Sequence, residues 1–169
     1  GPRRGIKPMG EKPSGLFLSL LAGVGTAVLS PFEVNGMPIA LLAIPFAVLA
    51  GKWHGIENGI VVGVAGSVIA GVLTQSIGNE GIISMIIGSS LAVWGNEFVG
   101  KIKDSEVFIR GGFIVLGVLV MEIVSDILMG ESLFLRSESF LGTEPVTALR
   151  IGFALLATWI LTEVFATKK

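Results

Sequence analysis

The chain has 169 residues, of which 51% are hydrophobic and only 15% are charged, and its formal net charge is −1. A soluble domain usually carries about 25% charged residues, so this composition excludes an ordinary water-exposed surface and favours a protein surrounded by lipid. The chain has no cysteine and a single histidine, which excludes disulfides, thiolate chemistry and a multi-histidine metal site. It also lacks the stripe of basic residues that would indicate nucleic-acid binding.

Six apolar runs follow one another, and each is predicted to be a transmembrane helix. The second run is short, with Pro38 at its start and Pro45 inside it. A five-span alternative would make this run re-entrant. The predicted spans cover residues 14–29, 37–50, 59–77, 82–99, 107–129 and 147–166, in one transmembrane domain over residues 14–167. Residues 1–13 are predicted to be a basic cytoplasmic segment before it.

The distribution of Lys and Arg gives these spans a direction. With the N-terminus inside, ten of the twelve basic residues lie on the inner side, while Arg136 and Arg150 lie in or beside an outer loop. Positive residues accumulate on the cytoplasmic side, so we predict a multi-pass cell-membrane protein with both termini in the cytoplasm. The five-span map would move about half of these charges to the wrong side. The longest loop, residues 130–146, then faces outward as an interfacial helix or as a lid over a pocket.

Small residues recur at every fourth position on three spans, which places them on one face of each helix. Lipid supplies no hydrophobic drive between helices, so close backbone approach at such positions holds them together. These faces are predicted either to pack the bundle or to dock another membrane protein. They comprise Ser19, Gly23 and Ala27 in the first span, Gly59, Gly63, Ser67 and Gly71 in the third, and Ser84, Gly88 and Ala92 in the fourth.

A weak internal similarity links the first and fourth spans. Residues 19–28 and 84–93 share Ser, Gly, Ala and Val at the same offsets. Two copies of three helices each would have opposite orientations in the membrane, as in many transporters. The predicted fold is therefore an all-α integral membrane bundle of six helices, with a 3+3 inverted repeat as one arrangement of it.

Ionisable residues inside the spans fall into two layers. Each costs about 2.5–3.5 kcal/mol to insert, so such residues are usually paired or line a cavity. The outer layer is Glu122, Asp126 and Arg150. Its depths predict an Asp126–Arg150 pair with Glu122 deeper, either as a structural salt bridge or as an outward pocket for a ligand or ion. The inner layer, predicted to cluster near the cytoplasm, is Asn96, Glu97, Arg110 and Glu163.

The sequence contains no Gly-x-Ser-x-Gly elbow, no Walker A loop and no metal-ligand spacing of His, Asp and Glu. We therefore predict that the chain is not an enzyme, binds neither a metal nor a cofactor, and does not hydrolyse ATP by itself. A lipid-processing enzyme is a weaker alternative, because no spaced acidic motif supports it.

The overall plan resembles the substrate-binding S components of energy-coupling-factor transporters, which are similar in length and have six spans. The resemblance lies in Ser19, Gly23 and Ala27 of the first span and in the small residues from Gly59 to Gly71. It implies that the first-span residues dock a transmembrane coupling subunit and that the outer layer faces a ligand. The plan is also similar to that of the rod-shape protein MreD, and the resemblance does not separate the two.

Two hypotheses for the function follow. The first is an integral membrane subunit that binds or transports a small solute and lacks its own ATPase. The second is a non-catalytic structural or assembly subunit of a larger membrane complex. The expected partners are the lipid bilayer, other membrane subunits or copies of the same chain, and a small molecule under the first hypothesis, with no nucleic acid under either.

Overall fold

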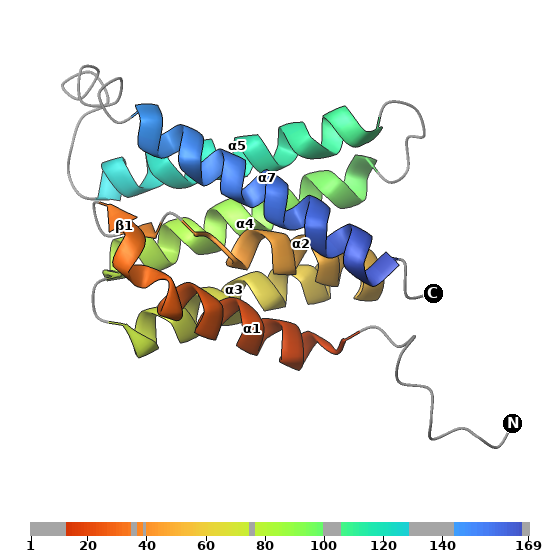
Figure 1. The fold of residues 1–169 in the computed structure, drawn as a ribbon, viewed down its shortest axis with the longest axis horizontal. Coiled ribbons are helices and arrows are strands. Elements are labelled where there is room, and N and C mark those ends of the chain that lie inside the picture. The colour runs from red at the N-terminus through yellow and green to blue at the C-terminus, as the bar shows by residue number, and fades with distance from the viewer. Residues whose placement is uncertain are drawn as a thin grey trace, which may run out of the picture.

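The computed structural model describes residues 13–34, 37–38, 40–74, 77–99, 106–128 and 144–166, and it shows a bundle of helices (Figure 1). This confirms the all-helical fold class. Between the first two helices lie a short 3-10 turn and a two-residue antiparallel pairing of β1 (Glu33–Val34) with β2 (Met37–Pro38). The helices in these residues are α1 (Gly15–Val28), α2 (Ala43–His54), α3 (Ile56–Leu73), α4 (Asn79–Val99), α5 (Glu106–Leu128) and α7 (Glu144–Ala166).

Successive helices run in opposite directions, so the start of α1 and the end of α7 lie at the same end of the bundle (Figure 1). We call this the terminal end, and it also holds the turn between α2 and α3. The opposite, distal end holds the β1–β2 pairing, the end of α5 and the start of α7. The predicted outward loop lies outside the described residues, except that α7 already begins at Glu144.

Helix α2 differs most from its predicted span. It begins six residues later than expected, because Met37 and Pro38 form β2. Pro45 lies in the first turn of α2, where the missing amide hydrogen of proline is tolerated. Its 12 residues extend about 18 Å, less than the thickness of a bilayer. The nine residues from Ala43 to Gly51 are all buried, and α2 is packed by α1, α3, α4 and α7. It is therefore the central helix of the bundle.

The polar stretch over residues 52–58, predicted to be a loop, is mostly helical. α2 continues to His54 and α3 begins at Ile56, so the chain reverses at Gly55 alone. Gly55 has φ 103°, a conformation that is available to glycine at little cost. A sharp reversal at one residue keeps α2 and α3 in close contact.

The small-residue faces pack helices inside the bundle. At the α1–α3 crossing, a Cβ on Gly66 would lie 2.8 Å from Ala22 Cβ, and at the α4–α5 crossing a Cβ on Gly88 would lie 2.6 Å from Gly117 O. On α3, a Cβ on Gly59 would lie 2.8 Å from Ala47 O of α2. Of the predicted small-residue faces on α1 and α3, Ser19, Gly23, Gly59, Gly63 and Ser67 are buried, and Ala27 and Gly71 are half-buried.

The two halves of the bundle are packed differently. In the first half, α1 lies along α3 and α2 lies against both. In the second half, α4 packs on α5, whereas α7 packs on α5 and on α2 and makes at most marginal contact with α4. In a 3+3 inverted repeat, the α1–α3 contact of the first half would correspond to an α4–α7 contact in the second half. Because α4 and α7 make at most marginal contact, the two halves do not share one set of helix contacts.

A helix that crosses a bilayer needs about 20 predominantly apolar residues. Within the described residues, α3 alone combines enough length with enough apolar character. Helix α1 is apolar but has 14 residues, which is short for a full span.

Candidate functional site

A buried ion pair joins α5 to α7 near the distal end. Arg150 Nη1 donates to Glu122 Oε2 at 2.6 Å, and the two side chains are 6% and 9% exposed. Glu122 lies six residues before the last residue of α5, and Arg150 lies six residues after the first residue of α7. Both therefore lie about 9 Å from the distal helix ends. Removing two charges from water costs several kcal/mol each, so each buried charge needs the other, and the pair fixes where α5 and α7 meet.

The structure thus places Glu122 against Arg150, and the predicted Asp126–Arg150 pair is not among the contacts it describes. The side chain of Asp126 lies outside the described residues. Positions 122 and 126 share a helix face one turn apart, and the described contact is made at the deeper of the two. Of the outer layer, Glu122 and Arg150 are brought together.

From this pair, α7 crosses obliquely and diverges from α5 toward the terminal end (Figure 1). Between the diverging helices lies a cavity of about 660 Å³, to which α2 and α4 also contribute. We call it the terminal cavity. Its mostly apolar wall is formed by Val48, Leu49, Gly111, Ile114, Leu155 and Trp159. Its polar side chains are Lys52, Asn96, Arg110, Thr158, Thr162 and Glu163.

Asn96 and Thr158 are the polar residues whose hydrogen bonds fix them in the wall. Asn96 is 2% exposed, and its Nδ2 donates to Ala92 O at 2.9 Å and to Arg110 O at 3.4 Å, which links α4 to α5. Thr158 Oγ1 donates to Ala154 O at 2.7 Å within α7. Asn96 Oδ1 accepts no hydrogen bond from a described residue, so the amide oxygen is available to a donor in the cavity.

Three charged side chains line the more exposed part of the cavity. Lys52 at the end of α2 and Glu163 near the end of α7 are exposed, and Arg110 in α5 is half-buried. Within the part of the chain that the structure describes, neither Lys52 nor Glu163 has an ion-pair partner. The charged side chains that the structure describes around the cavity are therefore two cations and one carboxylate.

Glu97 does not join the other three inner-layer residues. It lines a separate, smaller pocket with Ile56, Trp94 and Phe98, on the side of α4 where Phe98 stacks on Trp94. Successive residues of a helix point about 100° apart, so Asn96 and Glu97 face different neighbours although they lie at nearly the same depth. The structure therefore brings Asn96, Arg110 and Glu163 to one cavity and separates Glu97 from them.

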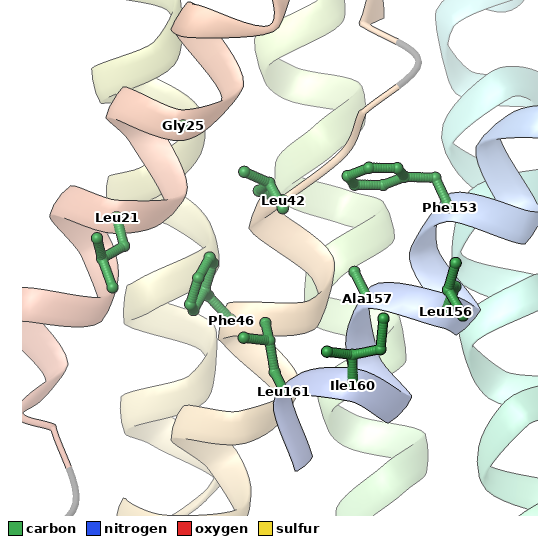
Figure 2. Close-up of a pocket in the computed structure, with 9 residues that line it drawn as sticks. All are labelled: Leu21, Gly25, Leu42, Phe46, Phe153, Leu156, Ala157, Ile160 and Leu161. Atoms are coloured by element: carbon green, nitrogen blue, oxygen red, sulfur yellow. The ribbon is translucent and has the colours of Figure 1, made fainter. Parts of the chain in front are cut away.

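A second hollow lies on the other side of α7. Figure 2 shows this apolar groove of about 420 Å³, in which Leu21 and Gly25 of α1 face Leu156 and Ile160 of α7, with Phe46 of α2 between them. Leu42, Phe153, Ala157 and Leu161 complete its lining, which contains no polar side chain. Helix α7 thus separates an apolar groove from the amphipathic terminal cavity.

Three polar residues of the terminal cavity were not predicted from the sequence: Lys52, Thr158 and Thr162. The sequence did contain a signal for Thr158 and Thr162, because residues 155, 158, 159 and 162 have the spacing of a single helix face. Lys52 was assigned to a loop and gave no such signal. Within the described residues, no three His, Asp or Glu side chains come together.

Comparison of the chain with protein-family models, with curated proteins and with solved structures finds no match in any of the three.

Proposed function

We propose that this chain is an integral membrane subunit that binds a small solute in the terminal cavity and lacks an ATPase of its own. The observation that carries the proposal is the cavity itself, about 660 Å³ between helices that are held together at their distal ends. Ligand sites are typically concave and mostly apolar, with a few polar groups that orient the ligand. The terminal cavity has this composition.

The distribution of polar and apolar side chains supports a location in the membrane. Leu16, Val72 and Trp159 are 73%, 74% and 61% exposed, whereas Ser67 and Ser84 are fully buried. A soluble bundle would carry large exposed apolar areas only at a binding site, because such areas cause association in water. In lipid, an apolar exterior with small hydroxyl residues between the helices is the stable arrangement.

The orientation rests on the positive-inside rule and on the common end of the two termini. Lys52 and Arg110 lie at the terminal end, and the basic residues of both chain termini belong to the same side of the predicted map. We propose that this end faces the cytoplasm of a cell-membrane protein. The terminal cavity then lies on the cytoplasmic side, whereas the resemblance to S components had suggested a ligand in the outer layer.

The alternative function, a structural or assembly subunit, would use an exposed face of small residues for docking. The small residues of α1, α3 and α4 instead lie against other helices of the same bundle, as Gly59 does against α2 and Gly88 against α5. This observation favours solute binding over the assembly role.

A pair of neighbouring substitutions tests the proposal. Leu155 lines the terminal cavity, whereas Leu156 lines the apolar groove on the other side of α7. Leu155→Trp fills the cavity, and Leu156→Trp is the matched control. Unfolding temperatures are measured in mild detergent against amino acids, nucleotides, vitamins, divalent cations and single-chain lipids.

A solute at about 100 times its Kd should raise Tm by about 5–10 °C in the wild-type chain and in Leu156→Trp. The shift should be lost in Leu155→Trp. An unchanged shift in Leu155→Trp, or no shift of the wild-type chain with any solute, contradicts the proposal.

A further inference from the structure

We infer that the terminal cavity takes an amphiphile with an anionic head, whose apolar part lies against α5 and α7 while its head lies beside Lys52 and Arg110. The inference rests on the proposed function and adds the chemical class of the ligand. The anion is a phosphate or carboxylate, since these are the groups that lysine and arginine bind in proteins.

The wall of the cavity supports the apolar part of such a ligand. Leu49, Ile114 and Leu155 come from α2, α5 and α7 and contribute only hydrocarbon to the wall. Among the described side chains of α7, only Arg150 and Ala154 are buried, and Trp159 beside the cavity is 61% exposed. A hydrocarbon chain can therefore enter between α5 and α7 from the lipid without crossing water.

The charges support an anionic head rather than a neutral or cationic one. Among the lining side chains that the structure describes, the cations Lys52 and Arg110 accompany the single carboxylate of Glu163. Lys52 is exposed and has no ion-pair partner among the described residues, so its ammonium can turn toward a ligand. An ammonium acts as a point charge, whereas a guanidinium can bind two oxygens of one anion at once.

Buried polar atoms provide a third point of recognition. Asn96 is almost fully buried in the cavity wall, and its amide nitrogen is already engaged by Ala92 O and Arg110 O. The amide oxygen and the Thr158 hydroxyl oxygen are left to accept hydrogen bonds, which suits a hydroxyl or amide next to the anionic group. A free inorganic anion would use none of the hydrocarbon wall and would compete with water for the exposed cations.

The probes are lauroyl lysophosphatidic acid, monolauroylglycerol and inorganic phosphate, titrated into the full chain in maltoside micelles. The first two share an acyl chain and differ in the anionic group, and the third supplies the anion without the chain. Binding constants are measured from Trp159 fluorescence in a variant with Trp53→Phe and Trp94→Phe, and Tm without ligand verifies that each variant is folded.

Lysophosphatidic acid should bind more tightly than monolauroylglycerol, and inorganic phosphate should not bind. Lys52→Gln and Arg110→Gln should each weaken binding of lysophosphatidic acid by about two- to fivefold, the range expected for partly exposed charge pairs. Glu163→Gln should strengthen it, because it removes the opposing charge. His54→Gln, at an exposed residue of the same helix end that does not line the cavity, should leave it unchanged.

Equal binding of the anionic and neutral lipids, insensitive to all three charge substitutions, overturns the inference and leaves the proposed function standing. Inorganic phosphate that binds as tightly as lysophosphatidic acid also overturns it, since the site would then recognise a free anion. If none of the three probes binds in a way that Leu155→Trp abolishes, the result counts against the inference and the proposed function together.

Discussion

Glu122 and Arg150 place opposite charges in the interior of the bundle, and this constrains how α7 packs. The buried hydroxyls of Ser19 and Ser67 find hydrogen-bond acceptors within their own helices, because each donates to the carbonyl oxygen four residues earlier. A buried charge has no such local solution and requires a group from another helix. The pair therefore fixes the depth of α7 relative to α5, while the rest of α7 makes few buried contacts.

The energy of this pair can be tested by replacing its members singly and together. Glu122→Leu and Arg150→Met should each destabilise the protein by about 3–5 kcal/mol, because each removes the counter-charge that the other residue of the buried pair contacts. The double variant removes both charges and should be more stable than either single variant. The measurement is the free energy of unfolding in one detergent, and a double-variant loss equal to the sum of the single losses would contradict direct coupling.

At the scale of helices, contact depends on glycines where two backbones meet. A Cβ on Gly59 of α3 would come within 2.8 Å of both Ala47 O and Gly51 Cα, which are backbone atoms of α2 that cannot rotate away. Gly112 of α5 offers a contrast, since a Cβ there would meet nothing within 4 Å. These two glycines separate the effect of packing from the effect of helix propensity.

Gly59→Ala should destabilise the bundle by about 1–3 kcal/mol, the usual cost of overpacking a tight contact. Gly112→Ala should be neutral or stabilising by up to about 1 kcal/mol, because alanine favours the helix and meets no neighbour. Thermal unfolding of both variants under the same conditions gives the comparison. Equal losses of stability would show that α2 and α3 are not as close as the structure has them.

The sequence predicted most helix positions well and α2 poorly, for a physical reason. The ends of α1 and α5 lie within one residue of the prediction, because polar residues border their apolar runs. Helix α2 is buried on all sides, so its residues show no amphipathic period that would mark its limits. The apolar run alone did not distinguish the β2 segment at Pro38 from the helix that follows it.

The sequence predicted how deep the residues of the candidate site lie along the bundle, but not which side of each helix their side chains occupy. The rise per residue grouped Asn96, Arg110 and Glu163 at one level of the bundle, and the three residues line one cavity. It also grouped Glu97 with them, although this residue faces another pocket. The angular position of a side chain depends on how the helices are rotated against one another, and a single sequence does not contain that information when apolar residues surround the whole helix.

At the scale of the whole molecule, the ion pair and the cavity belong to one arrangement. Helix α7 is attached to α5 near the distal end and lies apart from it toward the terminal end, with the terminal cavity on one side and the apolar groove on the other. The exposed side chains of α7 include the apolar residues Leu149, Leu156 and Ile160. The proposed membrane location would place these side chains in lipid rather than in water.

The orientation of the bundle in the membrane can be tested directly because the chain contains no cysteine. Glu57, in the first turn of α3, and Asn79, the first residue of α4, are exposed and lie at opposite ends of the bundle. Single substitutions Glu57→Cys and Asn79→Cys create one labelling site each. We expect a membrane-impermeant maleimide added to intact cells to label the Asn79→Cys variant and to label the Glu57→Cys variant only after permeabilisation.

Each pattern of labelling has a distinct structural meaning. The expected pattern requires that α3 crosses the bilayer and that the terminal end, with Lys52 and Arg110, faces the cytoplasm. The reverse pattern would place the terminal cavity on the outside and contradict the orientation, although the bundle would still cross the membrane. Labelling of both variants in intact cells, or of neither before permeabilisation, would place both ends of α3 on one side. That result would contradict the proposed transmembrane location, which places the exposed Trp159 of α7 in lipid.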